Sequence, residues 1–153
     1  MKTRFFLGKT ALLAILVLIN SCNKNPQYSI PEVYTDFTIR LDLPQYAALQ
    51  TVGNWVYVAT DQAENRVGYK GIFLYRAGFQ DYKAFDRACS YRPTESCHLI
   101  SVDSISSIFL GCSCCTSKYN FSGAVINLPA ALPLKQYQTY FTPSNNQLRI
   151  TNQ

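Results

Sequence analysis

The sequence predicts an all-β domain built from short antiparallel strands. In residues 37–43, apolar and polar side chains alternate, which is the pattern of a strand with one buried face. The chain contains 11 tyrosines and 9 phenylalanines but only 1 methionine, a composition that favours strands over helices. No segment has the spacing of an amphipathic helix of three turns, and the sequence has no internal repeat. We therefore expect one domain of short strands.

The first half of the domain begins with that strand and continues with four elements. Residues 44–50 start with a proline and fit a short helix or turn. Residues 55–59 are apolar and form the second expected strand, and residues 61–66 form a polar turn. A third strand is expected at residues 69–76, weakened by Gly71 because glycine has no side chain to pack.

The second half places cysteines at the ends of strands. A strand at residues 82–88 leads directly into Cys89. Strands at residues 98–102 and 108–110 flank a serine-rich turn, and the second of them leads into Cys112. The remaining elements, in chain order, are a turn at residues 122–123, an apolar run at 124–126, a proline-containing loop at 127–133, and two closing strands at 136–141 and 147–151.

Residues 1–21 have the features of a targeting segment. A basic head precedes the apolar run of residues 11–19, which is too short to span a bilayer as a stable helix. The run ends in Ile19-Asn20-Ser21-Cys22, which resembles the lipobox of bacterial lipoproteins, where the cysteine receives the lipid. We therefore expect a signal peptide at residues 1–21 and lipidation of Cys22. The alternative is ordinary signal cleavage nearby, with Cys22 as a plain thiol.

The expected lipid anchor sets both the location and the charge of the mature protein. Residues 22–30 form a lipidated tether in this interpretation, and it holds the domain of residues 31–153 on the periplasmic or outer face of a cell-envelope membrane. Because 3 of the 14 basic residues leave with the signal and all 9 acidic residues stay, the net charge falls from +5 to +2. This charge is too small to predict nucleic-acid binding. The expected partners are the lipid bilayer, through acylated Cys22, and an envelope protein.

The cysteines of the domain gather in two loops. The first loop begins Cys89-Ser90-Tyr91, and the second reads Cys112-Ser113-Cys114-Cys115-Thr116-Ser117-Lys118-Tyr119. Two strand ends that each deliver cysteines can hold a metal between them, because thiolates separated by a few residues converge on one site. The sequence therefore predicts a two-loop metal clamp.

The order of these motifs resembles the Rieske family of iron–sulfur domains. Rieske domains carry Cys-x-His on the first loop and Cys-x-x-His on the second, followed by a serine, an aromatic residue, a glycine turn and a proline loop. In this sequence the second loop is followed by Ser122-Gly123 and by Leu128-Pro129-Ala130, and the similarity runs from Phe37 to the C-terminus. The resemblance implies an antiparallel β-sandwich or barrel with two cysteine-bearing loops and a proline loop, as in small Rieske-like lipoproteins of Bacteroidetes.

The resemblance also assigns positions to the ligands. Cys89 and Cys112 occupy the two thiolate positions, whereas Tyr91 and Cys115 occupy the two histidine positions. Rieske chemistry depends on two neutral imidazoles on one iron, so this departure bears directly on the cluster. Cys115 can still ligate as a thiolate. The fourth ligand is then either Tyr91, which would be unusual, or His98, the only histidine, if the first loop is rearranged.

A disulfide is also implied by the resemblance. In Rieske proteins that carry one, a cysteine just after the first motif pairs with the middle cysteine of the second loop, and here these are Cys97 and Cys114. Five of the 6 cysteines follow the lipobox, so at least one is unpaired within the monomer or bound to metal. The three cysteines outside the implied bridge could hold a metal with one further ligand, or form a second disulfide and leave one thiol free.

The compartment and the surroundings of the loops decide between these alternatives. Ser117 and Tyr119 stand where cluster-bearing relatives donate hydrogen bonds to sulfur; without iron they cap and cover the loop. Thiols outside the cytoplasm tend to become disulfides, and residues 1–9 lack the Arg-Arg pair of the route that exports folded proteins. We therefore expect a structural or interaction module stapled by disulfides, with no cofactor. A [2Fe-2S] electron carrier is the alternative, and a zinc or other metal site is the third possibility.

Enzymatic activity is not expected. A cysteine nucleophile needs a nearby base, and His98 adjoins Cys97 in sequence, so their side chains point apart if both lie on a strand. The chain has no second histidine, no glycine-rich phosphate loop and no paired acids. We therefore expect a non-enzymatic role.

Overall fold

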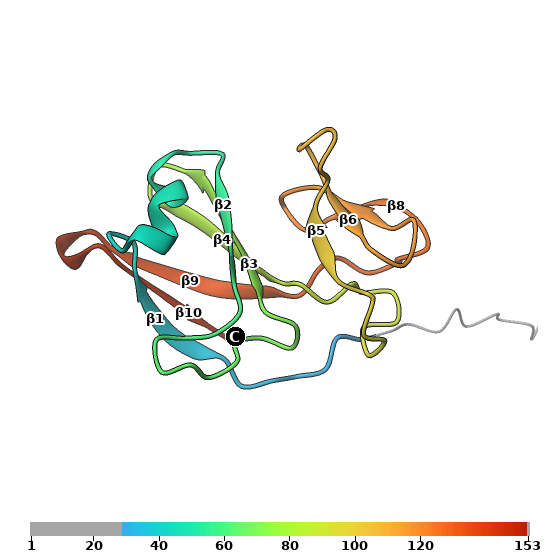
Figure 1. Ribbon diagram of the computed structural model, residues 1–153, viewed down its shortest axis with the longest axis horizontal. Coiled ribbons are helices and arrows are strands. Elements are labelled where there is room, and N and C mark those ends of the chain that lie inside the picture. Colours follow the sequence, from blue (N-terminus) through green and yellow to red (C-terminus); the bar gives the residue numbers. More distant parts are fainter. Residues whose placement is uncertain (1–28, 153) are drawn as a thin grey trace, which may run out of the picture.

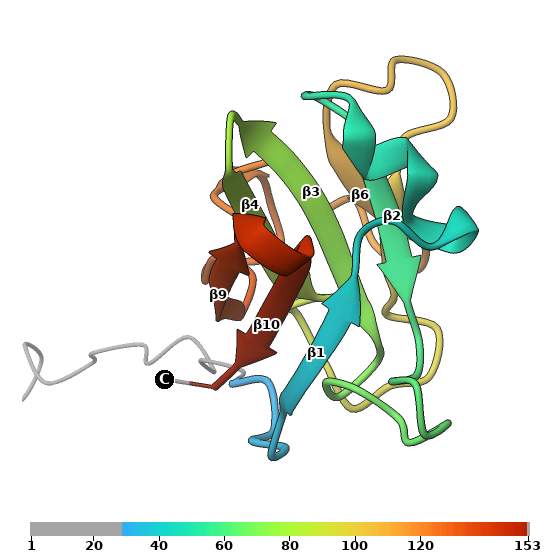
Figure 2. The ribbon, with the colours of Figure 1, turned by 90° about the vertical axis from the view of Figure 1, so that its left-hand side faces the viewer.

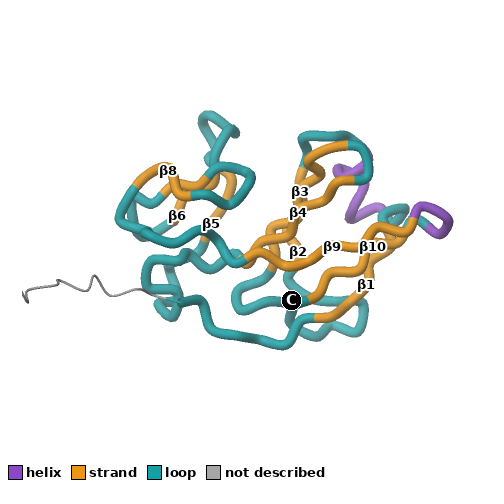
Figure 3. The backbone as a smooth tube through the Cα atoms, turned by 180° about the vertical axis from the view of Figure 1, so that it is seen from behind, coloured by secondary structure: helices purple, strands orange, loops and turns teal. Residues whose placement is uncertain are grey.

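The computed structural model describes residues 29–152 and shows an all-β, antiparallel fold. The predicted signal segment, Cys22 and the tether up to residue 28 lie outside the described residues. Two sheets stand next to each other in Figure 1, and Figure 3 shows how little of the chain is helical. Within residues 29–152 no helix is long and apolar enough to cross a membrane.

The larger sheet has six strands in the order β1-β10-β9-β4-β3-β2, and every pairing is antiparallel. In chain order the strands are β1 (Asp36–Arg40), β2 (Trp55–Val58), β3 (Ile72–Gly78), β4 (Asp81–Asp86), β9 (Gln136–Thr142) and β10 (Gln147–Thr151). Two 3-10 helices, η2 (Pro44–Gln50) and η3 (Pro143–Asn145), lie after β1 and between β9 and β10. The sheet is strongly curled, as Figure 2 shows, so that its two edges come to face a common interior.

The smaller sheet has four strands in the order β5-β6-β7-β8 and carries the cysteine loops. Its strands are β5 (Ile100–Val102), β6 (Leu110–Cys112), β7 (Lys118–Tyr119) and β8 (Val125–Asn127). The four strands are short, and the loops between them are long relative to their length. The proline loop leaves β8 and returns the chain to β9, which joins the two sheets.

Period-two alternation divides the interior into two cores. On β3, Ile72 and Leu74 point into the core enclosed by the curled sheet, whereas Phe73 points to the opposite face. Phe85 of β4 joins Phe73 there. The second core fills the space between the sheets and includes Cys89, Ile100, Leu110, Tyr119, Ala130 and Leu134, all buried. One face of the large sheet therefore supports the cysteine-bearing sheet.

Most predicted elements are present, but several end elsewhere. The strand predicted at residues 69–76 begins at Ile72, because Gly71 has a left-handed backbone (φ +85°) and the amides of Tyr69 and Lys70 donate to the Asp86 carboxylate at 2.6 and 3.2 Å. The strand predicted at 37–43 ends at Arg40, and the one at 82–88 ends at Asp86. Strand β7, which has only two residues, was not predicted from the sequence.

Candidate metal centre

Backbone pairing brings the two cysteine loops together around the start of β5. Ala88 forms an isolated bridge with Leu99, and the Cys89 amide donates to the His98 carbonyl at 3.0 Å. On the other side of the same segment, Ile100 of β5 is opposite Cys112 of β6. Residues far apart in sequence therefore meet on either side of one short stretch of chain.

Four potential ligands converge there: Cys89, His98, Cys112 and Cys115, whose ligand atoms all lie within 4.8 Å of one another. The Cys89 and Cys115 sulfurs are 3.8 Å apart, and the Cys112 sulfur is 3.9 Å from His98 Nδ1. Ligands bound to one tetrahedral zinc ion at the usual zinc–sulfur distance stand about 3.8 Å apart. These two distances between ligand atoms therefore match those around a single tetrahedral ion.

The site is largely withdrawn from solvent. Cys89 is fully buried and His98 is 4% exposed, whereas Cys112 and Cys115 are partly exposed. Tyr91, the other candidate fourth ligand, lies next to His98 with ring centroids 5.7 Å apart, and its backbone carbonyl is 2.6 Å from His98 Nδ1. The side chain that stands among the thiols is therefore the imidazole, while Tyr91 lies beside it.

Hydroxyl groups contact two of the sulfurs. The Tyr119 hydroxyl is 3.2 Å from the Cys89 sulfur, and it also accepts the Ser90 amide hydrogen at 3.2 Å. Ser117 Oγ is 3.1 Å from the Cys115 sulfur and accepts the Ala130 amide of the proline loop at 2.9 Å. Ser117 and Tyr119 thus stand next to sulfur, at the places expected from the sequence, and they link the ligands to the rest of the second core.

Burial and hydrogen bonding make the three thiols unequal. Burial raises the pKa of Cys89 above its usual value, although a hydrogen bond with Tyr119 offsets part of the effect. Burial also raises the pKa of Cys112, to about 12. Burial acts in the same direction on Cys115, but hydrogen bonds with Ser117 and neighbouring thiols outweigh it and lower the pKa of Cys115 below its usual value. A metal ion would displace protons from the two thiols that otherwise hold them tightly.

A disulfide joins the two loops directly beside the thiols. Cys97 and Cys114 are bonded; their Cα atoms are 5.7 Å apart, and the two residues are 17 positions apart in sequence. These are the two cysteines that the resemblance pairs. Because His98 follows Cys97 and Cys115 follows Cys114, the bond holds together the neighbours of two potential ligands.

Two charged residues that the sequence did not single out support the histidine. Glu95 Oε2 is 3.1 Å from His98 Nε2, and the Lys70 ammonium group donates to the backbone carbonyls of Glu95 and, at 3.2 Å, His98. Lys70 comes from the turn before β3, so it connects the large sheet to the first cysteine loop. Glu95 and His98 are three positions apart, a spacing that brings side chains together only in a turn. A strand was expected from residue 98, so this contact was not predicted.

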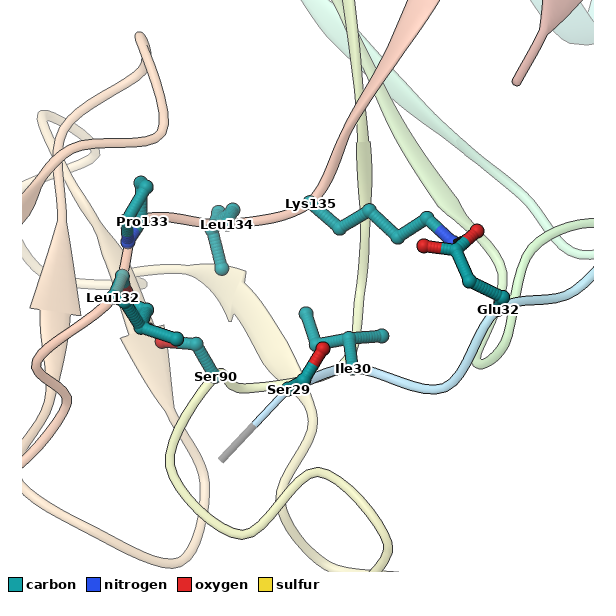
Figure 4. A pocket seen from close by; sticks show the side chains of 8 residues that line it. All are labelled: Ser29, Ile30, Glu32, Ser90, Leu132, Pro133, Leu134 and Lys135. Carbon is teal, nitrogen blue, oxygen red and sulfur yellow. Dashed lines mark hydrogen bonds and ion pairs between the residues drawn. The ribbon is translucent and has the colours of Figure 1, made fainter. Parts of the chain in front are cut away.

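A pocket of about 260 Å³ lies on the far side of the first cysteine loop. Figure 4 shows that it is bounded by Ser29, Ile30 and Glu32 on one side, and by Ser90 and the end of the proline loop on the other. Its charged groups already form an ion pair, because Lys135 Nζ is 2.7 Å from Glu32. Ser90 belongs both to the pocket wall and to the hydrogen-bond group around Tyr119, whose hydroxyl is 3.0 Å from Ser90 Oγ.

No protein-family model matches the chain, and no curated protein matches its sequence. The four-residue group and the disulfide are therefore the features on which a function can be argued.

Proposed function

We propose that this protein is a lipid-anchored, Rieske-like domain of the cell envelope that binds one zinc ion through Cys89, Cys112, Cys115 and His98. It is a non-enzymatic module in which zinc and the disulfide together fix the two loops for contact with an envelope partner. The observation that supports this most is the convergence of all four ligand atoms within 4.8 Å. Three thiolates and one imidazole form a closed set typical of structural zinc sites.

The spacing favours one ion over a two-iron cluster. A [2Fe-2S] cluster divides its four protein ligands between two irons, so the two pairs stand on opposite sides of the cluster. Ligands of one ion are instead mutual neighbours, as all four are here. The expected route of export supports the same choice, since a chain that crosses the membrane unfolded can bind zinc afterwards.

The metal would change what the three thiols do in an oxidising compartment. Without it, the Cys89 and Cys115 sulfurs, 3.8 Å apart, are close enough to form a second disulfide after a small movement. With zinc bound, all three thiolates are metal ligands and none is free to react. The Cys97–Cys114 bond restricts the same loops, so few residues must be ordered when the ion binds.

A second candidate, a [2Fe-2S] electron carrier, is favoured by one observation. The hydroxyl groups of Tyr119 and Ser117 lie 3.2 and 3.1 Å from the Cys89 and Cys115 sulfurs. Hydrogen bonds to cysteine sulfur raise the reduction potential of a cluster, a benefit that a zinc site does not need.

Metal content and colour separate the two. The full chain, purified without a histidine tag under anaerobic conditions, should contain one zinc per chain and be colourless. Replacing zinc by cobalt should give the visible bands of a tetrahedral thiolate site. Two irons per chain with visible charge-transfer bands would replace the zinc proposal by the electron carrier. Metal-free protein with a second disulfide would instead support the metal-free module.

A pair of variants tests the fourth ligand. His98→Gln should lower zinc affinity by at least tenfold, because it removes a coordinating atom. Tyr91→Phe is the matched control: it keeps the ring and the backbone carbonyl and removes only the phenol oxygen, so zinc affinity should be unchanged. The reverse result would make Tyr91 the ligand.

A further inference from the structure

We infer that Glu95 is a positioning residue for the metal: its carboxylate accepts a hydrogen bond from His98 Nε2–H and so presents Nδ1 as the ligating atom. The inference rests on the proposed metal site and adds a residue that neither the motif pattern nor the ligand set contains. It assigns a definite tautomer and a definite ligating nitrogen to the only histidine in the chain.

The two sides of the imidazole ring face different surroundings. Nδ1 is 3.9 Å from the Cys112 sulfur, on the side of the thiols. Nε2 is 3.1 Å from Glu95 Oε2. A carboxylate accepts hydrogen bonds and cannot donate when ionised, so Nε2 carries the hydrogen in this contact. The remaining nitrogen, Nδ1, then has its lone pair available for a metal.

The Tyr91 carbonyl shows what happens at Nδ1 without a metal. It lies 2.6 Å from Nδ1, in the place that a metal ion bound to Nδ1 would take. The carbonyl must therefore turn away when a metal ion binds. The contact with Glu95 is on the other nitrogen and is therefore kept in both states.

Several contacts hold Glu95 beside His98, and its side chain is 47% exposed. The amide of His98 donates to the Glu95 carbonyl at 3.1 Å, and Lys70 donates to the same carbonyl. The second carboxylate oxygen, Oε1, pairs with Arg92 at 3.3 Å. The disulfide at Cys97 fixes the chain between Glu95 and His98. The carboxylate is thus positioned by the same turn that carries the ligand.

This arrangement has a known physical effect. A carboxylate behind a metal-bound histidine fixes the orientation and tautomer of the ring and increases the basicity of the ligating nitrogen. Loss of such a partner weakens metal binding by about 10- to 100-fold. The His98 side chain is 5% exposed but that of Glu95 is 47% exposed, so water can replace part of the lost contact and the expected loss lies near the lower end of this range.

The experiment uses the tag-free full chain loaded with zinc and labelled with ¹⁵N-histidine. Two-bond ¹⁵N–¹H correlation spectra of the single histidine should show a metal-bound Nδ1 and a protonated Nε2. Chelator competition should show zinc affinity about 10- to 100-fold weaker in Glu95→Ala, and an intermediate affinity in Glu95→Gln, whose amide oxygen still accepts the hydrogen bond. Glu64→Ala and Glu64→Gln, which change an exposed glutamate on the turn between β2 and β3, should bind as the wild type does.

The outcomes separate the role of Glu95 from the presence of the zinc site. A spectrum with metal on Nε2, or an unchanged affinity in Glu95→Ala, overturns the role of Glu95 while the zinc site stands. A wild-type chain that binds no zinc overturns the zinc proposal and this inference together. Equal thermal stability of the metal-free wild type and Glu95→Ala, with the Cys97–Cys114 bond intact, shows that a weaker affinity does not come from misfolding.

Discussion

At the scale of single residues, Tyr119 connects the thiols to the core. It is fully buried, and its hydroxyl contacts the Cys89 sulfur and both the amide and the side chain of Ser90. Tyr119→Phe keeps the ring but removes the acceptor of the buried Ser90 amide, whereas Ser90 Oγ keeps its hydrogen bond to the Leu132 carbonyl. We expect the free energy of unfolding to fall by about 1–3 kcal/mol, measured by urea denaturation.

The matched control is Tyr140→Phe, because Tyr140 lies on β9 and is 53% exposed. Water replaces the hydrogen bond of an exposed hydroxyl, so this variant should unfold at the same urea concentration as the wild type within experimental error. Equal losses in the two variants would contradict a special role for the Tyr119 hydroxyl.

The fourth ligand shows where residue patterns stop being informative. The cysteine spacing predicted two loops that meet, and the implied partners Cys97 and Cys114 are bonded. The choice between Tyr91 and His98 could not be made in the same way, because it depends on the path of the chain between them. The turn that ends with the His98 amide bonded to the Glu95 carbonyl brings the imidazole back to the thiols.

At the scale of elements, the turn at Gly123 sets how closely the second sheet approaches the first. Gly123 has φ +82°, and a Cβ at this position would stand 2.6 Å from Phe85 Cε1 of β4. Gly123→Ala therefore combines backbone strain with a steric clash. We expect its free energy of unfolding to be lower than that of the wild type by more than about 1 kcal/mol.

Gly53→Ala separates the two causes. Gly53 has a similar φ of +90°, but a Cβ there would meet nothing within 4 Å. This variant should show the backbone strain alone, so the additional loss in Gly123→Ala, about 1–3 kcal/mol, measures the clash. Thermal or urea unfolding of the two variants makes the comparison, and equal losses would mean that Phe85 moves away without cost.

The disulfide is the second element-scale constraint. It joins residues 17 positions apart. Closing a loop of this size lowers the entropy of the unfolded chain and so stabilises the folded state by about 3 kcal/mol. The double variant Cys97→Ser with Cys114→Ser should lose about that free energy of unfolding. A phosphine reductant should produce the same loss in the wild type and none in the variant. If it destabilises both, another bond must be present.

The ends of strands were harder to predict than their existence. Alternation fixes which residues face the core, and it correctly indicated the strand that became β1. The two closing strands that became β9 and β10 were also predicted. Where β3 begins depends on Asp86, whose carboxylate takes the amides of Tyr69 and Lys70 away from the sheet. Such a contact across 16 or 17 positions leaves no local pattern. The two-residue strand β7 likewise depends on its pairing with β6 and β8, which its own sequence does not indicate.

At the scale of the whole molecule, the proposed location depends on Cys22. Cys22→Ala should abolish labelling of the protein by an alkyne analogue of palmitate, because the acceptor thiol is lost. Ser21→Ala, which keeps a small residue before the expected cleavage site, should still be labelled. Labelling that persists in Cys22→Ala would place the lipid elsewhere or point to a different modification.

The shared loops also link two chemical equilibria that are usually discussed separately. The Cys97–Cys114 bond and the four converging ligands order the same two segments. If the bond strengthens metal binding by some factor, bound metal must stabilise the bond against reduction by the same factor. Metal occupancy would then report the thiol–disulfide balance of the surroundings: a reducing environment would release the ion, and an ion-rich one would keep the disulfide closed.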